Sequence, residues 1–444
     1  MLKLTNTLSR KKESFEPIKK NIADLYVCGI TPYDYAHLGH GRCYTAFDLL
    51  VRVLKFLNYD VHYCRNFTDI DDKILKRALI EFGDINRYPE ITTKYINAFN
   101  EDVKSLNCLD PTFEPRVTQM IPHIISFIEK LIQKGHAYAS DGDVYFSVDS
   151  FDQYGKLSKQ KKDDLISGQR VEQNDRKRSP LDFALWKKTD DGTFWKSPWG
   201  YGRPGWHIEC SVMAEQYLGK EFDIHGGGRD LIFPHHENEI AQSESLHDLP
   251  MARIWMHNGF VQINKEKMSK SLGNFFTLRD IFKQFDPMVI RYYFLSHHYG
   301  APLDFSFDDV TAVQKSYKRL TRVFDALCSQ DISHQDMLTS PTVQKMLVFL
   351  YDDLNTPGML GVLFEHLDRL QKDKDELCVV KFFLQQVLGL TLEPLPEKKV
   401  TITPEIQQLI DERVQARADK DWAKADQLRD KLIELGVDLK DKKI

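Results

Sequence analysis

The stretch DLYVCGITPYDYAHLGHGRCYTAFDLLVRVLKFL, residues 24–57, decides the fold. It opens with a short apolar run, residues 24–30, that breaks at Gly29 as a buried strand does. Residues 37–57 then carry apolar side chains at helical spacing, and DVHYCRNFTDI, residues 60–70, is a second predicted strand. A strand, a helix and another strand in this order predict a parallel sheet of the α/β class.

A second strand–helix–strand segment follows much later in the chain. EFDIHGGG, residues 221–228, and RIWMHNGFV, residues 253–261, are predicted strands, and PHHENE, residues 234–239, is expected to form the first turns of the helix between them. Between the two segments, residues 137–148 predict a hairpin with its turn at Asp141-Gly142, and the residues that follow show weak periodicity. The sequence thus predicts a Rossmann-type parallel-sheet domain that is split by an insertion.

The whole chain divides into five predicted parts. The first half of the split domain, the insertion, the second half, a helical bundle and a small C-terminal helical region are expected at residues 1–110, 111–205, 206–300, 301–392 and 400–444. After about residue 300 the pattern is helical throughout, and EPLPEKK, residues 393–399, is typical of a linker.

Composition is that of a soluble globular protein. Of the 444 residues 42% are apolar and 28% charged, and no run of about 18 apolar residues or secretory-type N-terminus appears. Seven cysteines in a long chain favour a reducing compartment, the cytoplasm, with free or metal-bound thiols. The net charge of −5 excludes a globally basic nucleic-acid binder, but residues 156–188 hold ten Lys or Arg against five Asp or Glu and favour a local basic surface.

HLGH, residues 37–40, lies where the first helix begins. A helix N-terminus presents unpaired N–H groups and a positive dipole end, and so attracts phosphate. His37 and His40, one turn apart, would add donors towards the same anion, and Gly39 would let a ligand approach the backbone closely. A purely structural helix start is the alternative for this short pattern.

KEKMSKSLGN, residues 265–274, follows a strand late in the predicted sheet. Its three lysines, two serines and one glycine are typical of a positively charged loop that clamps a polyphosphate as charge develops in a displacement. A solvated basic turn is the alternative. The two motifs lie in the two halves of the split domain, which favours a shared role at one polyphosphate.

PHHENE concentrates two histidines and two glutamates at the predicted start of a helix. His235 and Glu239, four positions apart, share one face. The pair could hold a metal, serve as an acid and a base, or form a solvated helix start, because helix N-termini favour acidic residues. His236 is also one turn from Glu239, so the residues alone leave open which histidine would bind a metal.

Longer segments carry a resemblance to a known family. CGITPYDYAHLGHGR, RNFTDIDDKI, RPGWHIECSVM, HGGGRDLIFPHHENEIAQSE and DDLNTP resemble segments of the cysteinyl-tRNA synthetases, a class I aminoacyl-tRNA synthetase family, and the likeness runs from about residue 20 to 440. HLGH and KMSKS resemble the two ATP-binding signatures of that class, with Leu38 in place of the usual isoleucine. The resemblance implies that the split domain is catalytic and that the two helical regions contact tRNA at its stem and anticodon.

The resemblance also implies a reaction and its partners. L-cysteine would attack the α-phosphate of ATP, giving cysteinyl-adenylate and pyrophosphate, and the 3′-terminal adenosine of tRNA(Cys) would then take the cysteinyl group. The enzyme is expected to be a monomer, with no membrane among its partners. ATP is expected to carry Mg²⁺.

Residue roles follow from the same resemblance. It places a zinc ion on Cys28, Cys210, His235 and Glu239, a set whose thiolate, imidazole and carboxylate groups suit zinc. It places ATP against His37, Gly39, His40, Gly227, Asp230, Lys267, Ser269 and Lys270, with His37, His40, Lys267 and Lys270 as the catalytic residues, and cysteine against Gly29, Thr68 and Trp206. Taken singly, each cysteine is more often a small buried hydrophobe.

Zinc would also explain selectivity. An apolar pocket separates near-isosteres such as cysteine and serine by only about 10²-fold, and the insertion leaves little room for an editing domain. Zinc instead favours sulfur over a hydroxyl. We therefore expect selection of cysteine through direct sulfur coordination.

Two other functions remain open at the level of sequence. A cysteine-activating ligase of a small amine would share the catalytic half but lack a tRNA-directed C-terminal region, whereas ARADKDWAKADQLRDKL, residues 416–432, resembles the anticodon-binding region of the family. A non-catalytic zinc-binding paralogue would carry damaged ATP signatures, and both signatures are intact.

Overall fold

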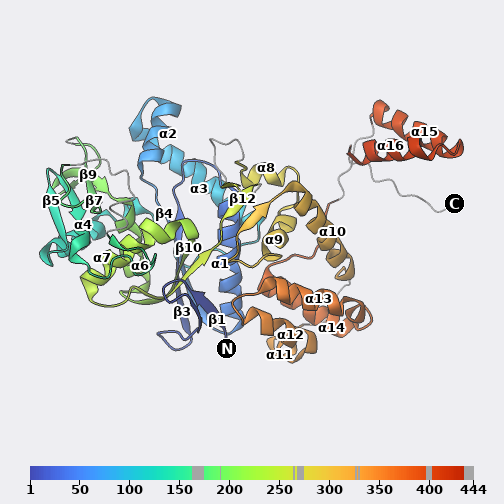
Figure 1. Ribbon diagram of the computed structural model, residues 1–444, viewed down its shortest axis with the longest axis horizontal. Coiled ribbons are helices and arrows are strands. Elements are labelled where there is room, and N and C mark those ends of the chain that lie inside the picture. The colour runs from blue at the N-terminus through green and yellow to red at the C-terminus, as the bar shows by residue number, and fades with distance from the viewer. Residues whose placement is uncertain are drawn as a thin grey trace. The chain divides into compact units, whose positions relative to one another are not determined.

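A four-stranded parallel sheet lies at the centre of the computed structural model (Figure 1). Its strands are β3 (Ile22–Ile30), β4 (Asp60–Phe67), β10 (Phe222–Gly228) and β11 (Ala252–Asn258), in the spatial order β11-β10-β3-β4. The structure describes residues 1–162, 175–190, 192–263, 266–267, 275–325, 328, 331–396 and 403–434. These residues form two compact units, Met1–Glu393 and Pro394–Ile444.

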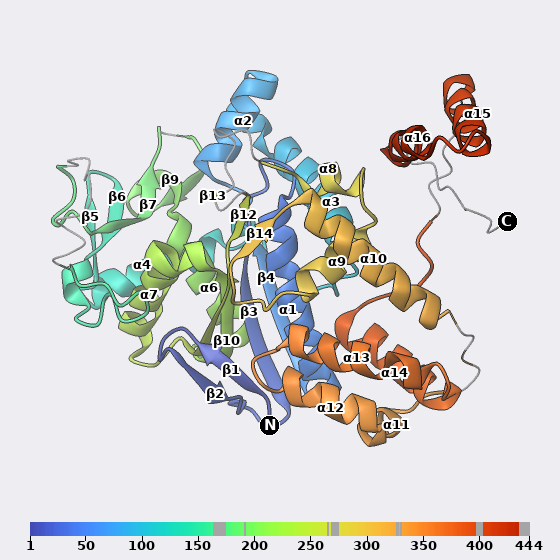
Figure 2. The same cartoon turned by 45° about the vertical axis from the view of Figure 1, so that its right-hand side comes forward.

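Helices cover both faces of this sheet, as a parallel sheet requires. On one side α6 (Trp206–Leu218) packs on β3 and β4, together with α7 (Glu237–His247) and α4 (Ile121–Gln133). On the other side α1 (Leu38–Phe56) packs on β4, β10 and β11, and α9 (Pro287–Leu295) packs against α1 (Figure 2). The predicted α/β fold is confirmed.

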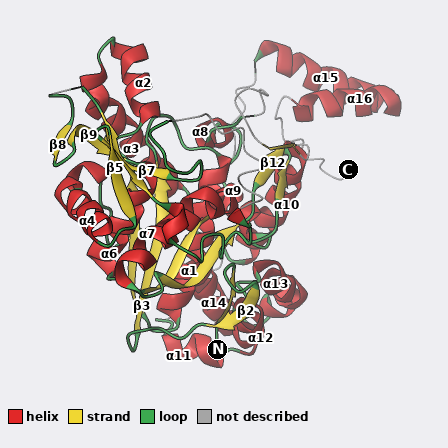
Figure 3. Cartoon of the chain, turned by 60° about the vertical axis from the view of Figure 1, so that its left-hand side comes forward, coloured by secondary structure: helices red, strands yellow, loops and turns green. Residues whose placement is uncertain are grey.

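The insertion carries a second, antiparallel sheet. Its strands are β5 (Ala137–Ser140), β6 (Asp143–Phe146), β7 (Phe183–Lys188), β8 (Trp195–Ser197) and β9 (Gly200–Pro204), in the order β5-β6-β7-β9-β8 (Figure 3). The predicted hairpin is confirmed, and both of its turn residues, Asp141 and Gly142, have positive φ, as a tight hairpin turn requires. The last three strands were not predicted.

The remaining elements of the first unit lie at its N-terminus, beside the sheet, and after it. A hairpin joins β1 (Lys3–Asn6) to β2 (Lys11–Ser14), and a small sheet has the order β13-β12-β14, with β12 at Val261–Ile263, β13 at Glu266–Lys267 and β14 at Leu303–Phe305. The other helices are α2 (Asp72–Phe82), α3 (Tyr88–Ser105), α8 (Leu278–Phe282), α10 (Phe307–Val323), α11 (His334–Thr339), α12 (Pro341–Leu350), α13 (Thr356–Leu370) and α14 (Lys374–Phe383), and the short helical turns are Ile85–Arg87, Val117–Gln119, Val148–Ser150, Arg229–Leu231, Ile232–His236 and Leu384–Leu388.

The second unit is a pair of helices, α15 (Pro404–Ala418) and α16 (Trp422–Glu434). Thr403 caps α15 by accepting a hydrogen bond from the Ile406 N–H. Part of the predicted linker, residues 397–399, lies outside the described residues, and residues 393–396 form no helix or strand. Among the described residues, no helix is both long and apolar enough to cross a membrane.

Two expectations need correction. PHHENE was expected to form the first turns of a helix, but Ile232–His236 form a π-helical turn in which Phe233 is extended, and α7 begins only at Glu237. All seven cysteines were expected to be free or metal-bound, but Cys328 and Cys378 form a disulfide, because α14 brings their Cα atoms to 5.7 Å. Cysteine usage therefore no longer argues for a reducing compartment.

A buried cluster of charges joins the parallel-sheet domain to the helices that follow it. Asp48 of α1 is paired with Arg52 and Arg291, and its other carboxylate oxygen accepts the Leu109 N–H at 2.7 Å. Arg291 of α9 also donates to the carbonyl oxygens of Leu388, at 2.7 Å, and Leu106, at 2.8 Å. One ion cluster thus fixes four segments that are distant in sequence.

Gly389 makes this cluster possible. It has a φ of 62°, a conformation that other residues rarely adopt, and a Cβ atom there would lie 2.5 Å from Nη2 of Arg291. Its carbonyl oxygen accepts a hydrogen bond from Asn107 Nδ2 at 2.8 Å. The end of the helical bundle therefore closes directly over the guanidinium groups.

Replacing Arg291 with methionine should destabilise the first unit strongly. The change leaves the buried Asp48 carboxylate with one partner fewer, and breaking a buried pair costs about 3–5 kcal/mol. Thermal and urea unfolding would measure the loss. Arg319→Met is the matched control, because Arg319 pairs with Asp368 on the surface and should change stability little. Equal stability of the two variants would contradict the structural role assigned to the cluster.

Candidate active site

The carboxyl ends of the parallel strands meet at one edge of the sheet, where open α/β sheets hold their ligands. Cys28 lies near the end of β3, Thr68 directly follows β4, Gly227 lies near the end of β10 and His257 near the end of β11. The sheet order therefore gathers predicted site residues from both halves of the split domain.

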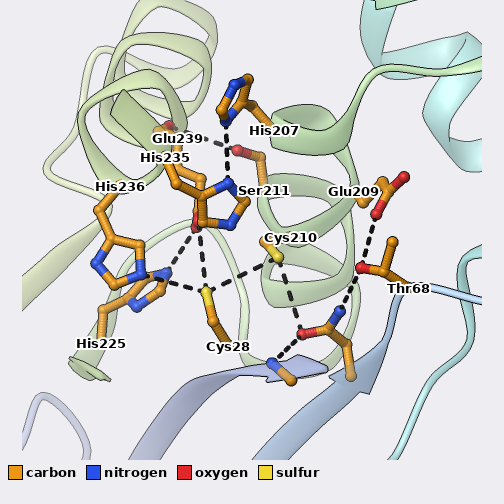
Figure 4. A network of polar contacts seen from close by, with 12 residues as sticks. Cys28, Thr68, His207, Glu209, Cys210, Ser211, His225, His235, His236 and Glu239 are labelled. Atoms are coloured by element: carbon orange, nitrogen blue, oxygen red, sulfur yellow. Dashed lines mark hydrogen bonds and ion pairs between the residues drawn. The ribbon is translucent and has the colours of Figure 1, made fainter. Parts of the chain in front are cut away.

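Four of the predicted residues form a compact buried cluster below this edge (Figure 4). Sγ of Cys28 lies 3.9 Å from Sγ of Cys210 and 3.6 Å from Oε1 of Glu239, which in turn lies 2.9 Å from Nε2 of His235. Cys210 is presented by α6, and Glu239 by α7. All ligand atoms of this quartet lie within 4.8 Å of one another, so the structure brings the four residues together.

A second quartet shares two members with the first. Nε2 of His225 lies 2.7 Å from Oε2 of Glu239, and Nε2 of His236 lies 3.2 Å from Sγ of Cys28. Cys28, His225, His236 and Glu239 therefore also satisfy the geometric requirement for a metal site. The sequence reasoning treated His236 as a rival ligand but missed His225 and His257. A histidine inside a buried strand, as at His225, or near the end of one, as at His257, is the signal that could have found them.

The electrostatics of the cluster favour charge on three of its members. Burial by itself lowers the pKa of His235, but the charge of Glu239 and the hydrogen bond with Cys210 raise that pKa to about 10. A hydrogen bond from the Cys28 thiol lowers the pKa of Cys210 to about 6. Burial raises the pKa of Glu239, but His225 and His235 outweigh it and hold that pKa well below the usual value. Burial and its neighbours Cys210 and Glu239 raise the pKa of Cys28.

The donor set fits a divalent cation of intermediate softness. Two thiols, an imidazole and a carboxylate converge in a space from which solvent is excluded, and buried charges need a partner or a metal. Zinc binds this combination of groups. Metal binding would displace the protons of His235 and Cys28, since ligands must be deprotonated.

The residues predicted to contact cysteine lie around the same cluster. The Gly29 N–H donates to Oδ1 of Asn66 at 2.8 Å, and a Cβ atom at Gly29 would lie 1.5 Å from the Asn66 carbonyl oxygen, so only glycine fits. Thr68 donates from Oγ1 to Oε2 of Glu209 at 3.0 Å (Figure 4). Asn66 and Glu209 were not predicted, and they orient this wall of the site.

Trp206 separates the cluster from a cavity. Its ring stacks on His235 with centroids 4.2 Å apart, and it remains 40% exposed. The cavity has a volume of about 600 Å³ and is lined by residues that include Thr31, Lys73, Tyr145, Lys187, Trp206 and His207. His207 also meets His235, Nδ1 to Nδ1, at 2.9 Å. The first quartet is thus one ring away from a space that can admit a small molecule.

His37 and His40 stack on each other at the start of α1, with ring centroids 3.7 Å apart. Nδ1 of His37 accepts the Gly39 N–H at 3.1 Å, and Nδ1 of His40 accepts the His37 N–H at 3.3 Å. Burial and the neighbouring His37 lower the pKa of His40, so its ring is neutral. With Nδ1 accepting, the ring proton of each neutral histidine lies on Nε2, which is then a donor for an anion.

The structure describes only some of the other residues predicted to bind ATP. Gly227 is buried at the end of β10, and Asp230 is exposed in the turn that follows. The backbone of Lys267 lies in β13, beside β12. Ser269 and Lys270 lie outside the described residues, so their assignment stays a prediction.

Family models match two parts of the chain. The catalytic domain of class I tRNA synthetases of the cysteine type, "tRNA synthetases class I (C) catalytic domain", matches residues 14–315, and "Cysteinyl-tRNA ligase anticodon binding domain" matches residues 400–443. Among solved structures, methionyl-tRNA synthetase of Mycobacterium tuberculosis with methionyl-adenylate has a TM-score of 0.61 at 14% identity, covering 84% of this chain and 92% of its own. At that identity the likeness shows the fold alone.

Full-length relatives are much more similar in sequence. The cysteine–tRNA ligase of Pelobacter propionicus is 46% identical over 484 residues, covering 99% of this chain and 98% of the relative. That of Shewanella sediminis is 47% identical over 455 residues, with the same coverage of both chains. Together with the matched catalytic and anticodon-binding models, these similarities show that the chain belongs to the cysteinyl-tRNA synthetase family of class I aminoacyl-tRNA synthetases.

Proposed function

We propose that this protein is a cysteine–tRNA ligase, which activates L-cysteine with ATP and transfers it to the 3′ end of tRNA(Cys). The observation that carries the proposal is the buried quartet of Cys28, Cys210, His235 and Glu239 beside an open cavity, in a chain that matches this family from end to end. A ligase of a small amine is disfavoured, because residues 400–443 match an anticodon-binding domain.

We assign zinc to this quartet rather than to the one with His225 and His236. His235 stacks on Trp206, which lines the cavity, whereas His225 and His236 pack against the buried ring of Trp255, at 4.4 and 5.4 Å between centroids. A zinc ion that meets substrate needs an open position, and the first quartet is separated from the cavity by the Trp206 ring, which lines that cavity and stacks on His235. The first quartet also supplies two thiolates, the softer donors.

Zinc at this site would supply a Lewis acid that favours a substrate thiolate over a hydroxyl, and this preference separates cysteine from serine. The chain's own residues orient the substrate around it. Gly29 keeps the backbone open at the end of β3, Thr68 is held in place by Glu209, and Trp206 covers His235. Selection therefore needs no editing domain.

The ATP phosphates would lie at the N-terminus of α1. His37 and His40 donate from Nε2 there, and the basic loop with Lys267, Ser269 and Lys270 would neutralise the departing pyrophosphate, with Mg²⁺ carried by ATP. Gly39, Gly227 and Asp230 would border the nucleotide. The His37–Phe275 ring contact, at 5.4 Å between centroids, supports this arrangement, because it brings the end of the basic loop to the α1 start.

tRNA would be read by the helical regions. We propose that residues 301–392 contact the tRNA stem and anticodon arm, and that α15 and α16 contact the anticodon. Trp422, at the start of α16, is 60% exposed and lies between Lys420 and Lys424, a combination that suits stacking on an unpaired base. We also propose that the enzyme works as a monomer, as the family resemblance implies, that it is located in the cytoplasm, and that it has the domain boundaries given above.

His235→Ala should lose zinc and cysteine-dependent ATP–pyrophosphate exchange, because it removes a ligand. His236→Ala is the matched variant and should still hold one zinc per chain at saturating metal. Metal analysis measures the zinc content of both variants, and X-ray absorption at the zinc edge measures the ligands around the zinc. In the unmutated protein, saturating cysteine should add one sulfur to the zinc environment. An unchanged sulfur count would refute metal-based selection, and zinc retention by His235→Ala would refute the ligand assignment.

Lys270→Ala should slow adenylate formation by about a hundredfold or more, the usual effect of losing one preorganised contact to developing charge. Rapid-quench measurement of activation would show it, while cysteine binding without ATP should not change. Lys283→Ala is the control, because Lys283 is an exposed lysine paired with Asp280 in α8. Normal single-turnover activation by Lys270→Ala would rule out its proposed role.

Trp422→Ala should weaken charging of tRNA(Cys) by about tenfold in kcat/KM, since stacking of one base is worth about 1–3 kcal/mol. Pyrophosphate exchange should stay normal, because that reaction needs no tRNA. Val414→Ala, which truncates another exposed apolar side chain of the second unit, is the control. If Trp422→Ala charged tRNA as well as this control, Trp422 would have no part in anticodon binding.

A further inference from the structure

A continuous chain of hydrogen bonds runs from the N-terminal hairpin to Cys28. Oγ1 of Thr7 lies 2.8 Å from Nδ1 of His257, and Nε2 of His257 lies 2.8 Å from Nδ1 of His236. Nε2 of His236 then lies 3.2 Å from Sγ of Cys28 (Figure 4). Each ring nitrogen of His236 and His257 therefore takes part in one hydrogen bond of this chain. The chain ends on the sulfur of Cys28, a residue of the proposed metal site.

The chemistry of the groups fixes the direction of this chain. A neutral imidazole has one N–H donor and one acceptor nitrogen, and both rings are buried with one hydrogen-bond partner at each nitrogen. A metal-bound thiolate carries no proton, so Nε2 of His236 has to donate to Cys28. Its Nδ1 then accepts from Nε2 of His257, and Nδ1 of His257 accepts from the Thr7 hydroxyl.

The start of the chain is held firmly against the sheet. Asn6 is buried and binds the free edge of β11, donating from Nδ2 to the Arg253 carbonyl at 2.9 Å and accepting the Trp255 N–H at 3.0 Å. The Thr7 N–H donates to the Trp255 carbonyl at 2.8 Å. The Thr7 hydroxyl therefore faces His257, two residues further along β11, in a defined position.

We propose that Thr7, His257 and His236 are positioning residues, which together donate a directed chain of hydrogen bonds to the Cys28 thiolate. The inference rests on the proposed metal site. It gives the N-terminal hairpin a role in metal binding, and it makes His236 a donor to a ligand instead of a ligand. Outer-shell partners of this kind orient the metal ligands and tune their basicity.

Whether loss of the Thr7 hydroxyl raises or lowers metal affinity depends on the two states of Cys28, the thiol without metal and the thiolate with metal. Without metal, the Cys28 thiol keeps its proton and donates it to Cys210, with 3.9 Å between the two sulfurs, so Cys28 does not depend on a donor from His236. With metal, Cys28 has no proton, and its sulfur accepts the hydrogen bond that the Thr7 hydroxyl directs through the two histidines. Removing that hydroxyl therefore weakens the metal-bound state more than the metal-free state, and metal affinity falls.

Thr7→Val tests this in the full chain, since valine has nearly the shape of threonine but no hydroxyl. Zinc affinity, measured by competition with a chelating dye, should fall by about tenfold, the lower end of the range for outer-shell partners. In the Co²⁺-loaded protein, the sulfur-to-cobalt charge-transfer band should move to longer wavelength, because a thiolate with a weaker hydrogen bond gives up charge more easily. Thr7→Ser, which keeps the hydroxyl, should have the zinc affinity and the cobalt band wavelength of the unmutated protein.

Thr5→Val is the matched control in the same hairpin. Its hydroxyl bonds to Asp353, at 2.5 Å, and does not meet the histidines, so metal affinity and the cobalt spectrum should match the unmutated protein. Identical zinc affinity and cobalt spectra for Thr7→Val and Thr5→Val would overturn the hydrogen-bond chain while leaving the metal site intact. Absence of stoichiometric zinc from the unmutated protein would instead overturn the proposed metal site, and the chain with it.

Discussion

The parallel pairing of β10 with both β3 and β11 is the interaction on which the active site depends. Residues 224–226 pair with residues 25–27, and residues 222–228 pair with residues 252–258, so one strand joins the two halves of a domain that the insertion separates. The register sets Cys28, Gly227 and His257 at the same edge. A slip by one residue would turn every side chain of β10 to the other face. His225 would then leave Glu239, and the buried carboxylate would lose one of its two imidazole partners.

Much of the fold could be predicted because its signals are local. The first strand and helix were expected at 24–30 and 37–57 and occur at Ile22–Ile30 and Leu38–Phe56. The hairpin turn was visible in Asp141-Gly142, where two adjacent residues favour positive φ. The strands β7, β8 and β9 were missed because each has only three to six residues and is held by pairing with neighbouring strands, which leaves no helical or alternating pattern. The Cys328–Cys378 bridge was missed for a related reason, since it depends on how the bundle brings residues 50 positions apart together.

The candidate site was predictable only in part from the residues themselves. His235 and Glu239 could be paired by helical spacing, but nothing in the sequence brings Cys28 to Cys210, 182 positions away, except the family resemblance. The polar groups behind the ligands were not foreseen. His225 and His257 follow from which strands are neighbours, and Asn66 and Glu209 follow from the packing of α6 on β4. These contacts are set by tertiary structure, whereas the motif residues stand next to each other in the chain.

The enclosure of Asp48 by Arg52 and Arg291 has a practical consequence in concentrated salt. Mobile ions screen charges that face solvent, but they reach a fully buried pair poorly. Raising the ionic strength to strip bound nucleic acid during purification therefore acts on phosphate contacts at the surface and on pairs such as Lys12–Asp352, whose side chains are about half exposed. The attachment of the helical bundle to the sheet domain through Arg291 is insulated from the same treatment. The protein can thus release nucleic acid in salt without loosening the joint between the two parts of its larger unit.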